Sequence, residues 1–513
     1  MAAVEGTPDP RVSKVVKLSF ESDGIRRAII ASYWLVVFLA LPLWWNTTSI
    51  ERLSLPTSRV LAQTDNELRF PVRVQLDTAS LNIDETVLAA TLQDILADRA
   101  SAAPLRWKGL DIEVVPKQRS GSPEIRESAG TYTVQLGGDR PRLEKRTLYF
   151  PWTKEYSLLR LADVLSILIA PSTSDHQSRE HRAVQYAPQY RLAFSLLNED
   201  AADGPAAVGW DIQSAIHRHI SPLLGSLSAL HNFTLESQIQ FHAPLAFSPA
   251  WLPDDNSYGL TPEDLTIFVN SAQWTLSSSS SNDPVLHFIL FIPTASRRPL
   301  NILDAQGMPL LSSAFLLPQW GGISIYNPPA EATTHLELST SQLDEPFSAF
   351  STQLLALLGV PRLPTGIPST DRSPLTPWQI DALLRKRAIE NTEESQETLQ
   401  SIVKLVQQIG NMPVGQYVKG DVQDALSALE KLYTVATSSP ALALRYSSQA
   451  LSLTSRAFFN PGMLALLYFP AEHKYAVYTP LFASAFVPLA AAAAREIIAW
   501  RRERRLSKRE KID

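Results

Sequence analysis

The sequence contains no cysteine among its 513 residues. Disulfides, thiolate zinc sites and a cysteine nucleophile are therefore excluded in this chain. A strong charge of one sign is also missing, because the formal net charge is −5 and no broad basic face is visible. A nucleic-acid partner is not expected for such a chain. With 45% hydrophobic and 19% charged residues, the chain can bury a large core in more than one folding unit.

The common motifs of hydrolases and nucleotide-binding proteins are missing as well. No GxSxG, HExxH, GxxxxGK[ST] or GxGxxG pattern occurs. His217 and His219 are two residues apart on an expected helix and so point to different faces, while His176 and His181 are five apart in a polar stretch. We expect neither pair to bind a metal. We predict no catalytic, metal-binding or cofactor-binding residue, and no cofactor.

What the sequence does contain is an uncharged apolar run near each end. The first, residues 28–45, reads AIIASYWLVVFLALPLWW and follows Arg26 and Arg27. It is just long enough to cross a bilayer, which takes roughly 20 residues of helix. The alternative is a cleaved secretory signal, which should be followed by small residues at the cleavage site. Because the sequence WWN stands there instead, a membrane anchor is favoured.

The second apolar run predicts a second membrane span over residues 475–499. It begins YAVYTPLFASAFVPLAAAAA and meets Arg495 near its end, whose long side chain can reach the headgroups. The alternative is a buried Ala-rich helix of a soluble domain. Pro480 and Pro488 favour the span, since membrane helices tolerate proline better than soluble ones do.

The residues flanking the two runs predict how the chain lies across the membrane. Basic residues precede the first run and follow the second, so both tails, residues 1–27 and 500–513, are expected on the cytoplasmic side. The region between the spans then lies on the opposite side, the lumen in a eukaryote. Aromatic side chains that prefer membrane interfaces would mark the lumenal boundary: Trp44, Trp45, Tyr475 and Tyr478.

Two glycosylation sequons lie in this lumenal region. Asn46-Thr47-Thr48 abuts the membrane, where a glycosyltransferase is not expected to reach it. Asn232-Phe233-Thr234 lies far from both spans. We therefore predict Asn232 as the glycosylated residue.

The region 46–359 alternates strand and helix patterns, which predicts a mixed α/β domain. Alternating or continuous apolar runs predict strands at 68–78, 110–117, 131–137, 147–151, 190–197, 233–242, 264–276, 285–292 and 322–326. Helices are expected at 83–100, 155–170, 209–230 and 341–359. The first helix should bury Val87, Leu88, Leu92 and Ile95, which share one face.

The composition changes after Gly359. Residues 360–377 are rich in proline and predict a linker or an irregular crossing. Residues 378–474 then predict a lumenal helical subdomain, whose first helix starts at Thr376-Pro377 and stops at Gly410. Apolar stripes at helical spacing mark two of its helices: Leu399, Ile402, Val403, Val406 and Ile409 in one, Leu426, Leu429 and Tyr433 in the other.

Four segments in a fixed order resemble one known family. They are PLWWNTTSIERLSLP (42–56), LPQWGGISIYN (317–327), LLALLGVP (354–361) and LLYFPAEHKYAVYTPLFASAFVPL (466–489). With the two spans, these segments resemble the PIG-S family, a subunit of the glycosylphosphatidylinositol (GPI) transamidase of the endoplasmic reticulum membrane. The first and last are the more specific.

The resemblance implies a non-catalytic scaffold in a hetero-oligomer that attaches GPI anchors to precursor proteins. The Cys-His chemistry would come from a caspase-like partner subunit, and membrane lipids would surround the spans. Two alternatives stay open on the residues alone. One is an independent membrane-anchored lumenal hydrolase acting through Asp, Glu or His, and the other is a lumenal receptor for lipid or cargo, which would need a large apolar pocket.

Overall fold

The structure is a computed structural model that describes residues 22–48, 51–63, 66–79, 81, 84–117, 130–153, 157–171, 184–276, 283–329, 335–409, 412–463 and 471–509. The chain divides into two compact units. The first unit comprises Met1–Leu55, Lys404–Lys419 and Phe458–Asp513, and the second comprises Pro56–Val403 and Gly420–Ala457.

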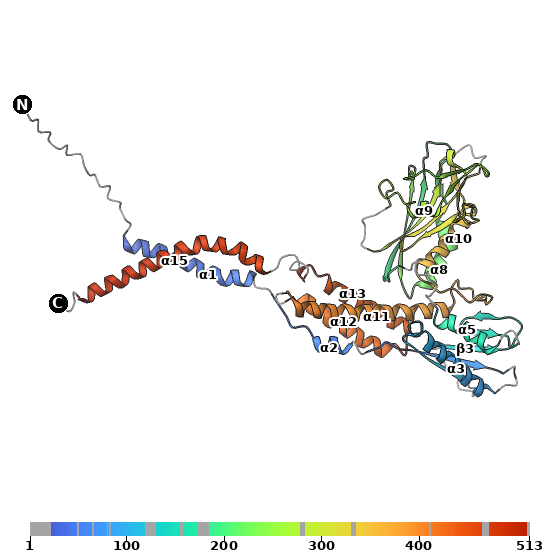
Figure 1. Cartoon of the computed structure of the whole chain (residues 1–513), viewed down its shortest axis with the longest axis horizontal. Helices are drawn as coiled ribbons and strands as arrows, with labels where there is room; N and C mark the ends of the chain where they lie inside the picture. Colours follow the sequence, from blue (N-terminus) through green and yellow to red (C-terminus); the bar gives the residue numbers. More distant parts are fainter. Residues whose placement is uncertain are drawn as a thin grey trace, which may run out of the picture. The chain divides into compact units, whose positions relative to one another are not determined.

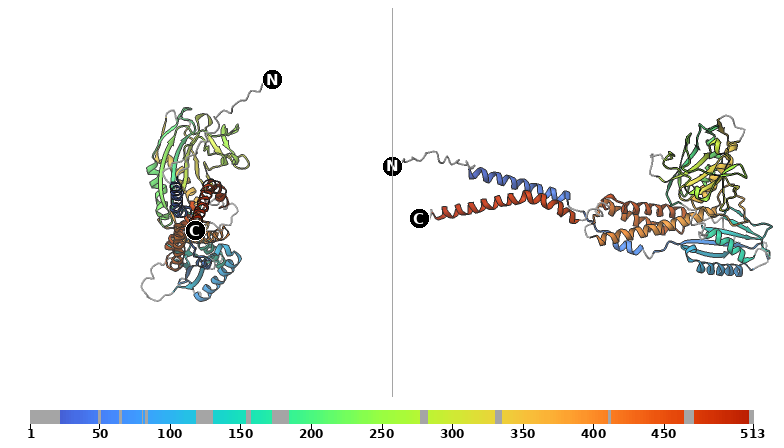
Figure 2. Two further views of the ribbon diagram at one scale, coloured as in Figure 1. Left: turned by 90° about the vertical axis from the view of Figure 1, so that its left-hand side faces the viewer. Right: turned by 45° about the horizontal axis from the view of Figure 1, so that its top comes forward.

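The first unit is built around two long helices from opposite ends of the chain. Figures 1 and 2 show α1 (Asp23–Thr48) and α15 (Ala471–Arg509) side by side. Their most apolar windows are Gly24–Leu43 and Phe482–Arg502, with mean hydropathies of 1.6 and 1.5 and no burial inside the protein. Both windows are long and apolar enough to cross a membrane. The side chains of Trp44, Trp45 and Tyr475 lie outside the described residues.

The second unit begins with a five-stranded sheet in the order β2-β1-β3-β5-β4. All neighbours are parallel except β4 and β5, which form an antiparallel pair. The elements of this part are α2 (Thr57–Gln63), β1 (Phe70–Asp77), α3 (Glu85–Ala102), α4 (Pro104–Trp107), β2 (Leu110–Pro116), β3 (Thr131–Leu136), β4 (Arg142–Glu144), β5 (Thr147–Phe150) and α5 (Leu158–Ile169).

Only one face of this first sheet is apolar. Val74 pairs with Val114 on one side and Tyr132 on the other, and all three side chains are buried in one core with residues of α3 and α5 and with Trp378. The opposite face carries polar side chains such as Arg73 and Glu113, which are exposed. This alternation along each strand places a single helical layer on the sheet.

The buried face of α3 differs from the predicted one in part. Leu88 and Leu92 are buried as expected, but Val87 is 62% exposed, and the other buried positions are Ala89 and Leu96. Asp84 caps the helix by accepting a hydrogen bond from the Thr86 N–H at 2.9 Å. The core-facing stripe is therefore rotated by part of a turn relative to the stripe chosen from the sequence.

A second five-stranded sheet follows, in the order β13-β14-β11-β6-β8. Four of its strands run parallel, and β13 is antiparallel to β14. In β6 nearly every side chain is buried, as expected for a strand covered on both faces. Its strands are β6 (Gln189–Asn198), β8 (Asn232–Gln240), β11 (Val285–Ile292), β13 (Ala314–Leu317) and β14 (Gly321–Ile325).

Short elements surround the second sheet. They are β7 (Ala207–Trp210), α7 (Ile212–Ala215), the π-helix η1 (Ile216–Ile220), α8 (Ser221–Leu227), β9 (Ala250–Leu252), β10 (Ser257–Leu260), α9 (Pro262–Thr266), the 3₁₀-helix η2 (Ala295–Arg297), β12 (Leu300–Ile302) and β15 (Leu336–Leu338). The strand predicted at 264–276 is wrong. A capping box between Thr261 and Asp264 starts α9 there, and turns follow in which the buried Phe268 and Trp274 reach the core.

Helices make up most of the remaining chain: α10 (Thr340–Leu357), α11 (Pro377–Gln408), α12 (Gln416–Val435) and α13 (Pro440–Phe458). The predicted start of α11 is confirmed, because Thr376 accepts from the Gln379 N–H at 3.3 Å while Gln379 accepts from the Thr376 N–H at 3.0 Å. Gly410 lies outside the described residues. The mixed α/β class with a helical C-terminal part is confirmed.

Candidate functional site

The two apolar helices are joined by charged side chains. Glu496 of α15 forms ion pairs with both Arg26 and Arg27 of α1, the second at 3.3 Å. Further along, the Trp34 ring meets Phe486 edge-on with centroids 5.6 Å apart. The basic residues predicted to flank the first span on the cytoplasmic side thus also hold the helix pair together, a contact between residues about 470 positions apart that no local pattern reveals.

The segment after α1 is tied to the α11–α12 connection within the same unit. The N–H of Leu53 donates to Val414 O and the N–H of Val414 donates to Glu51 O, both at 2.9 Å. Arg52 adds a hydrogen bond to the Val406 carbonyl at 2.7 Å. Residues 51–53 therefore form a short parallel bridge to Val414.

A buried polar cluster fixes the start of α11 in the second unit. Asp381, 4% exposed, accepts from the Tyr132 hydroxyl at 3.0 Å and from the Arg146 guanidinium at 2.9 to 3.1 Å. Arg385 donates to the same hydroxyl at 2.8 Å. Burial raises the pKa of Tyr132 to about 12, so its hydroxyl stays neutral and bridges Asp381 and Arg385. Trp378 stacks on the Tyr132 ring at 4.0 Å.

The neighbouring Arg387 binds a different part of the same unit. Its guanidinium donates to the carbonyls of Val184 at 3.3 Å and Leu358 at 3.1 Å, and pairs with Glu390 at 2.9 Å. Consecutive turns of α11 therefore contact the first sheet through Asp381 and the segments flanking the second sheet through Arg387. Helix α11 therefore connects the two sheets of this unit.

The carboxyl ends of the second sheet, where open α/β sheets usually bind ligands, are closed by the chain's own polar groups. Glu199, 3% exposed, follows β6 and accepts from the Thr294 N–H at 3.0 Å while pairing with Arg297. Asp203 accepts from the Ser296 N–H at 3.2 Å. Hydrogen bonds from Thr294 and Ser296 lower the pKa of the Asp203 carboxyl. Glu199 and Asp203 thus pair with Arg297 and with backbone N–H groups of residues 294–296, and these contacts serve the structure at the ends of β6 and β11.

The glycine pair after Trp320 lets three elements approach closely. A Cβ on Gly321 would lie 2.0 Å from the His287 carbonyl oxygen of β11, and a Cβ on Gly322 would lie 1.9 Å from the Gln353 side chain of α10. Gln353 uses this space to donate to Phe315 O at 2.9 Å and Ile323 O at 3.3 Å. The WGG segment is thus a packing feature of the second sheet.

One buried histidine, His231, and one half-buried histidine, His287 of β11, lie in or beside this sheet. The His231 ring donates from Nδ1 to the Ala187 carbonyl at 2.7 Å, and the His287 ring stacks on Trp320 with centroids 4.7 Å apart. Burial lowers the pKa of both imidazoles to about 4. Each ring is therefore neutral at physiological pH, which suits a packing role.

The histidines singled out from the sequence lie elsewhere. His217 and His219 belong to η1, and His219 meets Asp344 of α10 at 2.8 Å. His176 and His181 lie outside the described residues. In the described ranges of the chain, no group of three or more His, Asp or Glu side chains is arranged to hold a metal. Asn232 is the first residue of β8 and is exposed.

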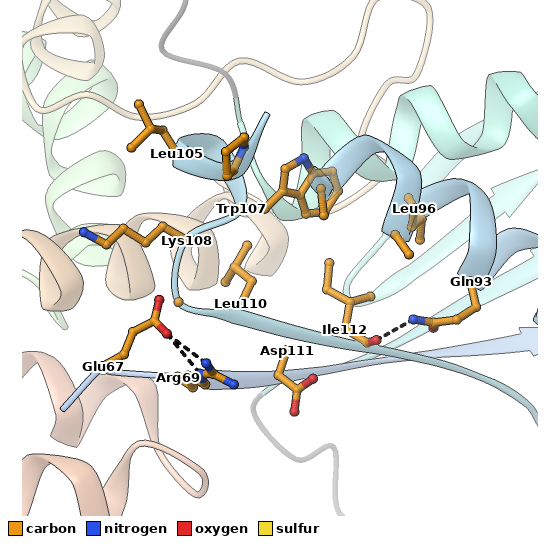
Figure 3. Close-up of a pocket in the computed structure, with 14 residues that line it drawn as sticks. Glu67, Arg69, Gln93, Leu96, Leu105, Trp107, Lys108, Leu110, Asp111 and Ile112 are labelled. Carbon is orange, nitrogen blue, oxygen red and sulfur yellow. Dashed lines mark hydrogen bonds and ion pairs between the residues drawn. The ribbon is translucent and has the colours of Figure 1, made fainter. Parts of the chain in front are cut away.

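A groove runs along β2, the edge strand of the first sheet. Its cavity of about 490 Å³ has an apolar floor of Leu96, Trp107, Leu110 and Ile112, and its rim includes Lys108 (Figure 3). We call it the β2 groove. The Gln93 side chain spans its floor, donating to Ile112 O at 2.9 Å and accepting from the Val114 N–H at 2.8 Å. Sequence reasoning missed this site, because its residues come from three elements.

Comparison with known proteins places these features in a family. Residues 31–503 match the family described as phosphatidylinositol-glycan biosynthesis class S protein, PIG-S. The chain belongs to this family. The match covers most of α1, both five-stranded sheets, the helical region and most of α15, so the resemblance drawn from four short segments is confirmed.

Members of the PIG-S family from distant organisms align with nearly the whole chain. The GPI-anchor transamidase component PIGS of Rattus norvegicus is 28% identical over 90% of this chain and 93% of its own length. The protein of the same name from Homo sapiens is 29% identical over 90% of this chain and 93% of its own. The GPI transamidase component PIG-S homolog of Schizosaccharomyces pombe is 29% identical over 96% and 87%.

Proposed function

We propose that this chain is a non-catalytic scaffold subunit of a GPI transamidase, the complex that attaches GPI anchors to precursor proteins in the endoplasmic reticulum. The observation that carries the proposal is the family match over residues 31–503, together with relatives named as transamidase components that align with about nine-tenths of the chain. The complete lack of cysteine supports a division of labour, in which a caspase-like partner subunit supplies the thiol nucleophile.

In this proposal α1 and α15 cross the membrane, both tails are cytoplasmic, and the bulk of the chain is lumenal. The apolar windows of both helices and the basic residues beside them support this orientation. The two sheets and α11 then form a rigid lumenal body attached to the bilayer at both chain ends. Such a body contributes to catalysis by holding a lipid amine and a lumenal acyl-enzyme close together, which is a matter of proximity and orientation.

The proposal is tested by purifying the tagged full-length chain in mild detergent and quantifying what accompanies it by mass spectrometry. We expect a caspase-like protein and multi-span membrane proteins in fixed stoichiometry. An untagged chain serves as the control for adherence to the resin. A tagged chain that elutes alone would contradict the proposal.

Asn232 is the proposed glycosylation site of the lumenal body. It starts the edge strand β8 and is exposed, as an acceptor must be. The variant Asn232→Gln should therefore migrate faster on a denaturing gel, and glycosidase treatment should remove the difference. Equal migration of the untreated proteins would show that Asn232 carries no glycan.

A further inference from the structure

The outer edge of β2 presents unpaired backbone groups in a regular array. Gly109 O accepts from the Phe70 N–H and the Lys117 N–H donates to Leu76 O, both at 2.8 Å, so the odd-numbered backbone groups of β2 face β1. The even-numbered groups of Leu110, Ile112 and Val114 therefore point outward. Within the part of the chain that the structure describes, no strand pairs with this edge.

The Gln93 amide already occupies part of the edge in the way that a strand would. It satisfies one outward carbonyl and one outward N–H, those of Ile112 and Val114, as the peptide group of a neighbouring strand does. The remaining outward groups of Leu110 and the Ile112 N–H have no such partner among the described residues. An added strand that displaced the Gln93 amide would replace its two hydrogen bonds, to Ile112 O and the Val114 N–H, with two of its own. It would also form new hydrogen bonds with the outward groups of Leu110 and the Ile112 N–H.

The side chains above the edge add an apolar surface. Leu96, Trp107, Leu110 and Ile112 form the floor of the β2 groove (Figure 3). Leu105 stands at its border with 87% of its surface exposed. Every second side chain of an added strand would face this floor, because strand side chains alternate between the two faces of a sheet.

Ion pairs compensate most of the charge at the rim of the β2 groove. Glu67 pairs with Arg69 at 2.9 Å and Lys108 pairs with Glu393 at 2.7 Å, while Asp111 is an exposed carboxylate of the lining and disfavours an acidic occupant. An exposed apolar border beside an open strand edge also favours aggregation when it stays uncovered. These features fit a permanently bound apolar segment better than a passing one.

We propose that the β2 groove binds an extended segment of another subunit, which adds as a strand to the free edge of β2 and places apolar side chains at alternate positions onto the groove floor. This inference rests on the proposed function, since it requires the other subunits to be present. Gln93 holds the edge in register until the partner strand displaces its amide.

The absence of native cysteine makes a direct test possible. In the variant Leu105→Cys the new thiol is the only one in this chain, and a thiol-to-photoreactive crosslinker can be attached to it in the detergent-purified complex. Crosslinks that also form in the wild-type complex come from thiols of other subunits and are subtracted. Crosslinks mapped by mass spectrometry should fall in one contiguous segment of another subunit. The matched control is Leu311→Cys, at a fully exposed leucine far along the chain, which should not label that segment.

Three crosslinking results would overturn the inference: crosslinks to a second copy of this chain, crosslinks to precursor protein alone, or crosslinks scattered in the same way as those from the control.

A second experiment compares Leu105→Lys with Leu311→Lys, both at exposed positions that leave the fold intact. Leu105→Lys should reduce retention of the crosslinked subunit by about tenfold, as expected for loss of an apolar anchor, and Leu311→Lys should not.

Ile112→Pro tests the backbone pairing itself. It removes an outward N–H without removing a bond to β1, so it should reduce retention of the same subunit by a similar factor. Full retention by Leu105→Lys and Ile112→Pro would overturn this inference alone. A wild-type chain that elutes without other subunits would overturn the proposed function and the inference together.

Discussion

At the scale of single residues, the tightest constraint in the protein is the glycine pair of the WGG segment. Gly321 allows β14 to lie against the backbone of His287, and Gly322 makes room for the Gln353 amide, which is 8% exposed. The amide donates to two carbonyls of the sheet, those of Phe315 and Ile323. The two glycines, which have no side chain, thus leave room for the Gln353 amide to link α10 to the sheet by hydrogen bonds.

Substituting Gly321→Ala should lower the free energy of unfolding by about 1–3 kcal/mol, because the new methyl group meets backbone that cannot rotate away. Denaturant titration of the detergent-solubilised chain measures the change. Gly225→Ala is the matched control, since Gly225 lies in α8 with no atom within 4 Å of the added Cβ. The control should be neutral or more stable by up to about 1 kcal/mol. Equal effects of the two substitutions would contradict the packing argument.

His231 makes stability depend on pH. Its pKa is lowered from 6.5 to about 4 by burial, so the folded chain resists a proton that the unfolded chain accepts. The contribution of His231 is complete above pH 6.5 and is lost as the pH falls from 6.5 toward 4. Because one pKa unit corresponds to about 1.4 kcal/mol, the loss amounts to roughly 3 kcal/mol.

The measurement is the thermal midpoint of the solubilised chain between pH 7 and pH 4. The variant His231→Phe should show a shallower decline than the wild type. Part of the decline should remain, because burial lowers the pKa of His287 in the same direction. Parallel curves for variant and wild type would show that His231 does not take part.

At the scale of elements, α11 determines how the second unit is held together. Its first turns carry Trp378, Asp381 and Arg385, which meet Tyr132 of β3, and Arg387 follows within the next two turns. An ion pair closed inside a protein is a weak source of net stability, but breaking one leaves an uncompensated buried charge. The cluster therefore fixes the orientation of α11 against the first sheet more than it adds to stability.

The substitution Asp381→Ala should lower the free energy of unfolding by about 3–5 kcal/mol, since Arg146 loses its carboxylate partner and the Tyr132 hydroxyl, to which Arg385 donates, loses its acceptor. Glu113→Ala is the matched control, because Glu113 also pairs with an arginine, Arg73 at 2.8 Å, but both side chains are more than half exposed. The control should change stability by less than about 1 kcal/mol. Chemical denaturation of both variants decides, and a small effect for Asp381→Ala would refute the role of the cluster.

The sequence predicted elements well where periodicity and burial agree. The strand at 285–292 and the start of α11 are reproduced, because a continuous apolar run and a capping box are local signals. The strand predicted at 264–276 is wrong, since Phe268 and Trp274 reach the core from turns and not from a regular ladder. The sequence places Val87 on the wrong face because the apolar positions of α3 fit more than one helical stripe.

The candidate site was beyond local prediction for a physical reason. Arg146 and Asp381 are separated by 235 positions in the sequence. Gln93 belongs to α3 and Ile112 to β2, and their side-chain to backbone contact forms only once the helix packs beside that edge strand. Periodicity shows which face of an element is apolar but not which element covers it. The edge position of β2, and with it the β2 groove, follows only from the sheet topology.

At the scale of the whole molecule, two apolar helices near the two ends of the chain pair through Glu496, Arg26 and Arg27. The described residues between them include two five-stranded sheets and α11, and the chain's own polar groups pair beyond the ends of β6 and β11 in the second sheet. A body of this kind suits the task of holding partners in register. We propose that it lies wholly across the membrane from both tails.

Protease protection of sealed endoplasmic reticulum vesicles tests that claim most directly. With the cytosolic face exposed to protease, only the two tails should be trimmed, and residues 56–463 should stay intact until detergent opens the vesicles. A cytosolic loop of a resident membrane protein serves as the control for protease activity, and a soluble lumenal protein as the control for sealing. Cleavage between residues 56 and 463 in sealed vesicles would contradict the account.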